Sequence, residues 1–377
     1  MLAKNLAFIR SRMKRRVKLS AVIKGNAYGH GIREMIPMLE NEGVNHFSVY
    51  GIEEAIAFHE CASQDSKLMI MGYLSRDNLL WAISQGYEFF IYDLYQLEQA
   101  IEAAKTVGTP AQVHIEVETG MNRTGVDEHH IRQLADMVKD NEVHLVLSGI
   151  CTHLAGAESI SNYYRINNQI QRFKRYLKFF REREINFLKR HVACSAGMIR
   201  YPETQYDMVR VGIMLYGLWP SRETFIHYLN EHSHVKNGLM VDDPMSSILS
   251  WKTQVMTIKH VEIGEYIGYG TTYLANRPMT IAIIPVGYAY GYARELSNQG
   301  RVLIGGERVQ VVGLVNMNMM AIDVTEIDHV KHGDEVVIIG SQGDKRITVS
   351  AFGQMSSQLN YELLSRLPHY IPRIIKD

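Results

Sequence analysis

The segment LSAVIKGNAYGHG, residues 19–31, joins a buried-strand pattern directly to a turn. Leu19 to Ile23 form an apolar run rich in branched side chains, which favours a buried β-strand. Lys24 ends this run, and the glycine and asparagine residues that follow it are typical of a turn. The sequence therefore predicts a lysine at the end of a buried strand.

A lysine in this position can be chemically reactive. Burial disfavours the charged ammonium and lowers the pKa of the side chain. The neutral amine is a nucleophile that forms a Schiff base with an aldehyde cofactor, and it can also act as a base. Taken alone, the pattern around Lys24 favours an ordinary lysine whose ammonium extends from the strand end into solvent, since most strand-end lysines have no special chemistry.

The composition is that of a globular protein with two domains. The chain has 377 residues, of which 46% are hydrophobic and 21% charged. A formal net charge of +0 gives no reason to expect nucleic-acid binding. Three cysteines without paired spacing indicate reduced thiols in the cytoplasm rather than a disulfide or metal framework. No apolar run reaches the ~18 residues of a membrane span, and the basic N-terminus is a poor signal peptide.

Short apolar runs alternate with amphipathic segments from residue 13 to about residue 230. The predicted strands are 18–23, 46–50, 67–71, 88–92, 111–117, 145–151, 190–194 and 208–215. The predicted helices are 2–13, 33–43, 52–62, 76–85, 94–106, 128–140, 161–183 and 197–201. This alternation predicts an α/β fold, a (β/α)8 barrel of the TIM type, in which chemistry collects at the C-terminal ends of the strands. Five polar residues lie at or near such ends: Lys24, Arg123, His153, Ser195 and Arg210.

The pattern changes after a polar segment at 230–250, which reads as a linker. Beyond it, β-rich segments with turn signals occur at 248–260, 279–286, 301–305, 308–316, 319–324 and 335–340. A helix-like stretch, 351–364, comes near the end. We therefore expect a barrel domain over residues 1–238 and a predominantly β domain over residues 239–377.

The segment AVIKGNAYGHG closely resembles the pyridoxal-phosphate lysine segment of alanine racemases, whose usual form is AVxKAxAYGHG. The resemblance implies the type III fold of pyridoxal-phosphate enzymes. It also implies that Lys24 carries pyridoxal 5'-phosphate as a Schiff base and is one of two catalytic bases, and that Tyr28 contacts the cofactor phosphate. The family usually has a short strand before the first helix, whereas this sequence opens directly into the predicted helix.

Arg123 lies in the segment ETGMNRTG, which follows a predicted strand. Its planar guanidinium suits a carboxylate or a phenolate, although an arginine in a loop is most often a solvated surface residue. The segment resembles the family's DTGMGRxG loop, whose arginine touches the cofactor's phenolic oxygen and the substrate carboxylate. Glu116 stands where many members have a lysine modified to a carbamate, and we expect it to orient Arg123 without modification.

Two further strand-end segments resemble the family's sequences. In CTHLAG, the resemblance places His153 beside the cofactor in support of Arg210, although a lone histidine is more often a satisfied core residue. In HVACSAG, Ser195 suits a phosphate oxygen at a helix N-terminus, a geometry that an ordinary N-cap serine shares.

The segment MVRVGIMLYG places Arg210 on an otherwise apolar strand, so its side chain needs a partner. The resemblance implies that this partner is the pyridine nitrogen of the cofactor. Because an arginine keeps its proton, the ring nitrogen should stay unprotonated, which favours racemisation over transamination. The backbone amides of Gly212 and Ile213 would complete a phosphate cradle.

Tyr269 lies in the segment YIGYGTTY of the predicted β domain. A tyrosine in a glycine-rich turn is usually structural. The segment resembles the family's SYGxTY, whose tyrosine is the second base. Since racemisation exchanges a proton on both faces of the α-carbon, two groups on opposite sides are required. The resemblance implies that Tyr269 comes from the partner subunit, so the homodimer would be obligate.

The remaining resemblances concern the substrate entrance. They imply that the backbone N–H of Met317 contacts the substrate carboxylate, and that Tyr288 and Tyr361 narrow the entrance, Tyr361 also contacting the cofactor phosphate. Three positions depart from the family's usual charged residues: Asn318 for aspartate, Leu314 for arginine and Tyr290 for aspartate. These exchanges leave the preferred substrate open.

The sequence thus predicts a pyridoxal-phosphate-dependent alanine racemase that interconverts L- and D-alanine with two bases and supplies D-alanine for peptidoglycan. We expect a cytoplasmic homodimer with a small amino-acid substrate and with no metal, nucleic-acid or membrane partner. The alternative is a serine or broad-specificity racemase of the same fold. A related barrel decarboxylase, usually longer, and a single-barrel cofactor carrier, which would need no Tyr269, are the other classes. Whether the role is biosynthetic or catabolic stays open.

Overall fold

The computed structural model describes all residues except 233–242, 356–359 and 377. The chain divides into two compact units. The first comprises residues 1–27 and 32–247, and the second comprises residues 28–31 and 248–377. The predicted domain boundary, between residues 238 and 239, lies outside the described residues.

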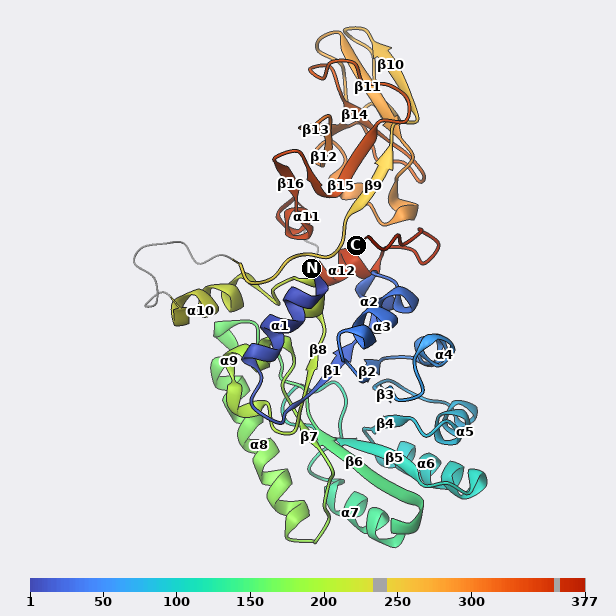
Figure 1. Cartoon of the computed structure of the whole chain (residues 1–377), viewed down its shortest axis with the longest axis vertical. Helices are drawn as coiled ribbons and strands as arrows, with labels where there is room; N and C mark the ends of the chain where they lie inside the picture. The colour runs from blue at the N-terminus through green and yellow to red at the C-terminus, as the bar shows by residue number, and fades with distance from the viewer. Residues whose placement is uncertain (233–242, 356–359, 377) are drawn as a thin grey trace. The chain divides into compact units, whose positions relative to one another are not determined.

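The first unit is built on eight parallel strands (Figure 1). Their order is β7-β6-β5-β4-β3-β2-β1-β8. The seam between β7 and β8 closes through a hydrogen bond from Arg210 N to Ala193 O (3.0 Å) and a bridge between Cys194 and Arg210. The predicted TIM-type barrel is therefore confirmed. The strands are β1 (Lys18–Val22), β2 (His46–Val49), β3 (Lys67–Ile70), β4 (Glu88–Ile91), β5 (Ala111–Glu116), β6 (Leu145–Cys151), β7 (Arg190–His191) and β8 (Met208–Val211).

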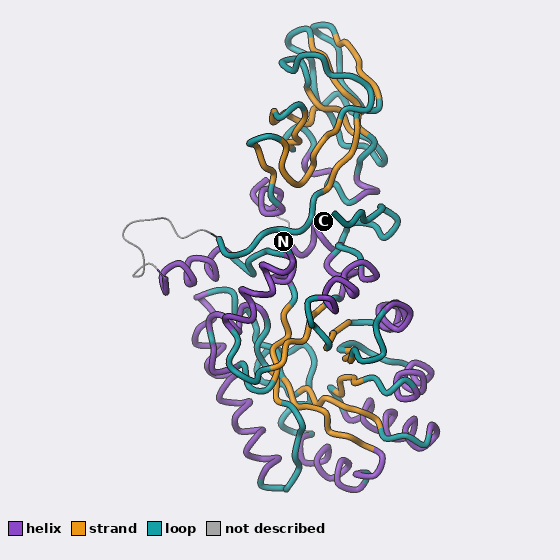
Figure 2. Tube along the Cα trace, viewed as in Figure 1, coloured by secondary structure: helices purple, strands orange, loops and turns teal. Residues whose placement is uncertain are grey.

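Helices connect these strands and lie outside them (Figure 2), whereas α2 is a left-handed turn at the end of β1. Local residues define where some of these helices begin and end. At the start of α6, the Asp93 carboxylate accepts from Gln96 N, and at its end Gly108 adopts a left-handed conformation. The helices are α1 (Leu2–Arg12), α2 (Lys24–Tyr28), α3 (Ile32–Asn41), α4 (Ile52–Cys61), α5 (Arg76–Ser84), α6 (Leu94–Val107), α7 (Ile131–Asp140), η1 (Glu142–His144), η2 (Ile160–Asn162), α8 (Tyr163–Arg181), α9 (Ser195–Arg200), η3 (Pro202–Thr204), η4 (Ile213–Tyr216) and α10 (Arg222–His232).

Several predicted boundaries differ from the structure. The strand predicted at 208–215 ends at Val211, because Gly212 N donates to Ser195 Oγ instead of to a neighbouring strand and the chain continues into η4. The strand predicted at 190–194 is only Arg190–His191. Helix α10 was not predicted, and it extends into the segment that reads as a linker.

The second unit is an antiparallel sheet of order β10-β11-β14-β13-β12-β15-β16, with β9 paired to β15. The predicted strand 248–260 is in fact two strands, since Val255 N bonds to Asp334 O whereas Met256 N bonds to Ile283 O. The chain therefore leaves one partner strand and joins another at this point. The strands are β9 (Trp251–Gln254), β10 (Thr257–Val261), β11 (Met279–Ile284), β12 (Arg301–Ile304), β13 (Glu307–Val312), β14 (Met320–Asp323), β15 (Glu335–Gln342) and β16 (Lys345–Ile347).

Short helices complete the second unit: η5 (Tyr288–Tyr290), η6 (Arg294–Leu296), α11 (Val349–Met355) and α12 (Asn360–Ser365). The helix predicted over 351–364 is thus described only in its two outer parts, since residues 356–359 lie outside the described residues. Among the described helices of the whole chain, none combines the length and apolarity that crossing a bilayer requires.

Candidate active site

The turn after β1 positions Lys24 at the end of the strand. Gly25, Asn26, Ala27 and Tyr28 all have φ between 52° and 64°, so this turn is left-handed. Left-handed backbone costs roughly 1–2 kcal/mol for each non-glycine residue, so it persists only where other contacts hold it. Two of these contacts are the bond from Ala27 N to Ile23 O (2.8 Å) and the bond from Ile32 N to Asn26 Oδ1 (2.9 Å).

Glu54 supplies the third contact, and sequence reasoning missed it. Its carboxylate accepts from Gly25 N (2.5 Å) and Asn26 N (3.4 Å), and its other oxygen accepts from Tyr50 N (2.8 Å) and Gly51 N (3.4 Å). Glu54 is the third residue of α4, and its carboxylate accepts from the backbone N–H of the N-cap residue Gly51, which is one half of a capping box. That capping pattern is the sequence signal that could have drawn attention to it.

The amine of Lys24 is perturbed by its neighbours. Burial lowers the pKa of Lys24, as do the charges of Arg123 and Arg210, whereas Glu54 opposes them. The lysine side chain as a whole is exposed, so water screens part of this shift. The direction is nevertheless that of a lysine that is deprotonated more easily than usual.

Arg210 is buried, with 6% of its surface exposed, and its guanidinium is fixed by three contacts. It donates to Thr152 O (2.9 Å), to His191 O (2.9 Å) and to His191 Nδ1. The backbone carbonyls and the imidazole are thus the partners that an arginine on an apolar strand was expected to need. Neither Thr152 nor His191 was among the predicted site residues, although His191 opens the segment that contains Ser195.

The pKa of His153 is affected by the same positively charged side chains. Burial lowers the pKa of His153 to about 3, with further lowering by Arg210, Arg123 and Lys24. The imidazole is therefore neutral at physiological pH. Lys24 follows β1, Arg123 and His153 follow β5 and β6, and Arg210 lies near the end of β8. Because these strands are parallel, the four residues lie toward the same mouth of the barrel.

Glu116 is buried, with 6% of its surface exposed. Burial raises its pKa, whereas a hydrogen bond with Thr124 and the charges of Arg210 and Arg123 lower it. Within the described part of the chain, Glu116 and Arg123 form no ion pair within 4.0 Å, and Arg123 itself is exposed. The orienting role of Glu116 stays a prediction.

Ser195 and the start of η4 bring together hydrogen-bond donors suited to an anion. Gly212 N donates to Ser195 Oγ (3.1 Å) in a buried environment. Ile213 begins η4, so its N–H has no acceptor within that helix. A serine hydroxyl beside backbone N–H groups is the donor set that a phosphate ester requires.

In the second unit, Tyr28 lies beside Tyr361, with ring centroids 5.9 Å apart and planes tilted by 52°. Gly29 holds this arrangement, because its carbonyl accepts from Arg373 (2.9 Å and 3.2 Å) and a Cβ at Gly29 would stand 2.0 Å from Leu364 O. With φ at +76°, this position accepts only glycine without strain. The two tyrosines that the sequence predicts near the phosphate are therefore neighbours.

Met317 and Tyr288 are also neighbours in the second unit. Tyr288 N donates to Asn316 O (3.0 Å) and Ala289 N donates to Met317 O (2.9 Å). The side chain of Met317 is 55% exposed, and Asn318 is exposed beside it. Tyr269 is 72% exposed in a turn between two glycines with positive φ. These side chains are thus open to a substrate or a partner.

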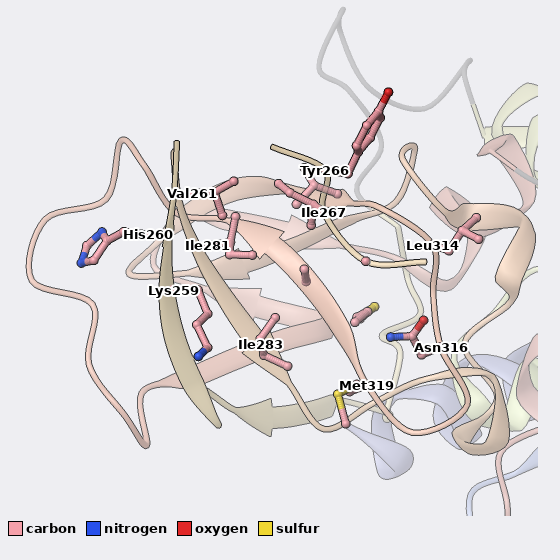
Figure 3. Close-up of a pocket in the computed structure, with 14 residues that line it drawn as sticks. Lys259, His260, Val261, Tyr266, Ile267, Ile281, Ile283, Leu314, Asn316 and Met319 are labelled. Atoms are coloured by element: carbon pink, nitrogen blue, oxygen red, sulfur yellow. The ribbon is translucent and has the colours of Figure 1, made fainter. Parts of the chain in front are cut away.

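A cavity of about 280 Å³ lies on the second unit (Figure 3). Apolar side chains such as Ile281 and Ile283 line most of it, with Leu314 and Asn316 at one side. It contains none of the residues predicted to bind cofactor or substrate. Its apolar lining does not suit a phosphate.

Comparison with known proteins gives consistent matches along the chain. The sequence model of the alanine racemase N-terminal domain matches residues 1–220, and that of the alanine racemase C-terminal domain matches residues 248–375. An alanine racemase from Leptospira interrogans (serogroup Icterohaemorrhagiae serovar copenhageni) is 33% identical, with 100% of this chain and 94% of that protein covered.

Solved structures agree with these matches. An alanine racemase from Clostridium difficile 630 has a TM-score of 0.85 at 29% identity, with 97% of this chain and 91% of that chain covered. An alanine racemase from Bartonella henselae with covalently bound pyridoxal phosphate has a TM-score of 0.81 at 25% identity, with coverages of 97% and 94%. The domain matches and the identity to the Leptospira protein show that this chain belongs to the alanine racemase family and is an enzyme, an amino-acid racemase.

Proposed function

We propose that this enzyme is a pyridoxal-phosphate-dependent alanine racemase that uses Lys24 and Tyr269 as its two bases. The observation that carries the proposal is the gathering of Lys24, Arg123, His153 and Arg210 at one mouth of the barrel, where the pKa of Lys24 is lowered. A lysine in that state can hold an aldehyde cofactor and can move a proton.

The residues present fit pyridoxal phosphate. Lys24 would hold its aldehyde carbon, and Arg210 would face its ring nitrogen with a guanidinium that Thr152 and His191 already orient. Ser195, Gly212, Ile213, Tyr28 and Tyr361 would hold its phosphate. The Bartonella henselae alanine racemase, with covalently bound pyridoxal phosphate, supports this assignment. When bound, the cofactor supplies an electron-withdrawing ring that makes the α-proton of an amino acid acidic.

The other site residues would bind the substrate and exchange its proton. Arg123 and the backbone N–H of Met317 would hold the carboxylate, which fixes the α-carbon relative to the two bases. Lys24 Nζ would take the α-proton of the D-enantiomer, and Tyr269 Oη that of the L-enantiomer. His153, neutral at physiological pH, would add no positive charge beside the two arginines, and Glu116 would supply a carboxyl group near them. Tyr288 and Asn318 would border the entrance.

Tyr269 would act in the site of a neighbouring copy, so the working enzyme would be a homodimer. The 72% exposure of Tyr269 supports this, since a second base must be accessible to another protomer. Alanine as the substrate suggests that the product, D-alanine, supplies peptidoglycan synthesis. Three free cysteines suit the reducing cytoplasm as the compartment.

Serine is the alternative substrate. The uncharged side chains of Leu314 and Asn318 favour it, because they replace charges that the family usually has around the entrance. Comparing the rates on L-alanine and L-serine decides between the two, and faster turnover of serine would overturn the choice of alanine.

The experiment that tests the proposal is a chiral assay of the purified protein with L-alanine, alongside its absorbance spectrum. We expect D-alanine to form, and we expect a visible band of bound cofactor that borohydride removes. Lys24→Ala should lose both the band and the activity. Lys18→Ala, at the opposite end of the same strand, is the matched control and should keep both. A band that persists in Lys24→Ala would refute the assignment.

A further inference from the structure

A continuous chain of buried polar side chains runs through the barrel interior from Arg210 toward the N-terminal ends of the strands. His191 Nε2 lies 2.7 Å from His114 Nδ1, and His114 Nε2 lies 2.8 Å from Glu88 Oε2. Lys189 donates to the other oxygen of Glu88 at 2.7 Å. The chain therefore joins the guanidinium at the active site to a carboxylate on β4.

A side branch starts from the same carboxylate. His46 Nε2 lies 3.2 Å from Glu88 Oε2, and His46 Nδ1 lies 2.9 Å from Ser20 Oγ. Ser20 Oγ lies in turn 2.5 Å from Ser48 Oγ. All of these side chains are buried, and Glu88 is only 4% exposed. Glu88 thus accepts hydrogen bonds from two histidines and one lysine.

Arg210 and Glu88, at the two ends of this hydrogen-bonded series, fix the direction of every hydrogen bond in it. A guanidinium only donates, so His191 Nδ1 must accept and the proton of His191 must sit on Nε2. His191 then donates to His114 Nδ1, which places the His114 proton on Nε2, where the Glu88 carboxylate accepts it. A second proton on either ring would set two donors against each other. Every hydrogen bond in the series is therefore donated in the direction from Arg210 through His191 and His114 to Glu88.

The titration behaviour of the rings agrees with this geometry. Burial lowers the pKa of His114 to about 4 and holds the pKa of His191 well below its usual value. Burial alone would raise the pKa of Glu88, but the hydrogen bonds from His114 and His46 outweigh it and hold that pKa below its usual value. Neutral histidines between a guanidinium and an ionised carboxylate are the state that the hydrogen bonds require.

The backbone makes room for the pair of imidazoles. The pairing of β5 with β6 shifts register between Val113 and His114, which brings Gly149 opposite His114. A Cβ at Gly149 would stand 2.2 Å from His114 Nδ1 and 3.0 Å from His191 Nε2. Gly149 has an ordinary backbone conformation, so the absence of a side chain matters here for space. A bulge and a glycine together create the site of the His114–His191 bond.

We propose that Glu88 is a positioning residue for Arg210, which it controls through His114 and His191 by holding both rings in the Nε2–H tautomer. The inference rests on the proposed function in one respect, namely that Arg210 faces the cofactor ring. In this arrangement His191 Nδ1 always presents a lone pair to the guanidinium. The orientation of the Arg210 guanidinium is thereby set from the far end of the barrel.

Glu88→Gln tests this directly, because an amide offers one acceptor and one donor where the carboxylate offers two acceptors. If the amide oxygen faces the histidines, its NH2 group opposes the Lys189 ammonium. If the NH2 group faces them, His114 and His191 must change tautomer and His191 opposes Arg210. Lys189→Met removes the first conflict. The double variant should therefore recover what Glu88→Gln loses, whereas a merely structural defect would grow worse.

The measurement is the ¹⁵N NMR spectrum of the histidine rings in the full-length protein as purified, which reports tautomers whether or not the enzyme racemises alanine. We expect the Nε2–H tautomer at His114 and His191 in the wild type and an altered tautomer at His191 in Glu88→Gln. The Glu88→Gln/Lys189→Met variant should return it to the wild-type form. Glu102→Gln, on the exposed face of α6, is the control and should change nothing.

Kinetics give the second readout. Partners that orient metal-bound histidines are typically worth about 10–100-fold, and by analogy kcat for alanine should fall about tenfold in Glu88→Gln with little change in KM. If Glu88→Gln fails to fold, Gly149→Ala separates the two imidazoles with every charge retained. Its kcat should then fall as predicted for Glu88→Gln, while Arg210 still keeps the His191 proton on Nε2. An unchanged tautomer at His191 in a folded Glu88→Gln variant, no recovery in the double variant, or an unchanged kcat in Gly149→Ala would overturn the inference. Absence of racemase activity with the tautomers as expected would instead refute only the proposed function.

Discussion

The residue that holds the beginning of the Lys24 turn is Glu54, whose carboxylate accepts from the backbone on both sides of the site. One oxygen bonds to Gly25 N and Asn26 N, and the other to Tyr50 N and Gly51 N. The same charge raises the pKa of Lys24 against burial and the arginines. Glu54 therefore affects both the conformation and the protonation of the lysine.

At this scale we predict that Glu54→Ala destabilises the fold and weakens cofactor retention. Loss of these acceptors should lower the free energy of unfolding by about 1–3 kcal/mol, because the left-handed turn loses a partner that offsets its strain. Urea unfolding and the rate of cofactor loss on dialysis measure the two effects. Glu53→Ala, on the exposed side of the same helix, should behave like the wild type. Equal behaviour of the two variants would contradict this role for Glu54.

Single residues also show what the sequence alone reveals. Lys24, Arg210 and Ser195 are recognisable because each interrupts an apolar strand or stands at its end, within a motif. The sequence predicts a turn after Lys24, but its left-handed conformation through Ala27 and Tyr28 is not recognisable, because alanine and tyrosine rarely take positive φ. The long-range contacts of Glu54 and Glu88 are not recognisable either, since Gly25 lies 29 residues from Glu54 and His114 lies 26 residues from Glu88, and such contacts depend on how the strands pack.

Among the elements, the seam between β7 and β8 closes the barrel and depends on few bonds. β7 has only two residues, and Arg190 within it forms two side-chain bonds and one backbone bond to the Asp207 carboxylate (2.7, 3.0 and 2.8 Å). The hydrogen bond from Arg190 lowers the pKa of Asp207. The ion pair is partly exposed, so water weakens it.

We predict that Asp207→Asn lowers the free energy of unfolding by about 1 kcal/mol at neutral pH. Because the folded-state pKa of Asp207 is lowered, its contribution is present above the usual aspartate pKa of about 3.9 and disappears as the pH falls through the lower folded value. The difference between wild type and variant in urea should therefore shrink below about pH 4. A difference that stays constant down to pH 2.5 would exclude this ionisation as the cause.

The elements also mark where sequence patterns fail. Alternation of apolar runs and amphipathic segments predicts the barrel, because each strand needs a helix to cover it. The ends of β7 and β8 were predicted too long, since apolar residues such as Ile213 and Leu215 continue into η4 while remaining buried. Burial and strand pairing look alike in a sequence, and only hydrogen-bond partners distinguish them.

For the molecule as a whole, the buried histidines couple stability to pH. Burial lowers the pKa values of His46, His114 and His191, so in the folded state these three rings of the barrel interior, like that of His153, are neutral where the unfolded chain binds protons. Their contribution is complete above the unfolded histidine pKa of about 6.5 and falls as the pH drops below it. Each histidine should account for a slope of up to about 1.4 kcal/mol per pH unit.

The measurement is the free energy of urea unfolding between pH 7 and pH 5. We predict a steep decrease in the wild type and a smaller slope in His46→Asn, which removes one of the three groups. His130→Asn, at an exposed position on the barrel exterior, should keep the wild-type slope. A wild-type protein whose stability does not change over this range would show that the three rings are not buried in neutral form.

Mixing two inactive variants tests the central claim most directly, namely that Lys24 of one protomer and Tyr269 of its partner serve one site. Lys24→Ala and Tyr269→Phe should each be nearly inactive alone. If they are unfolded and refolded together, half of the dimers are mixed, and each mixed dimer has one site with both bases intact, so about one quarter of wild-type activity should return. If both bases belong to the same protomer, every site in a mixed dimer keeps a defect. No recovery of activity in a refolded mixture shown to contain mixed dimers would contradict the account.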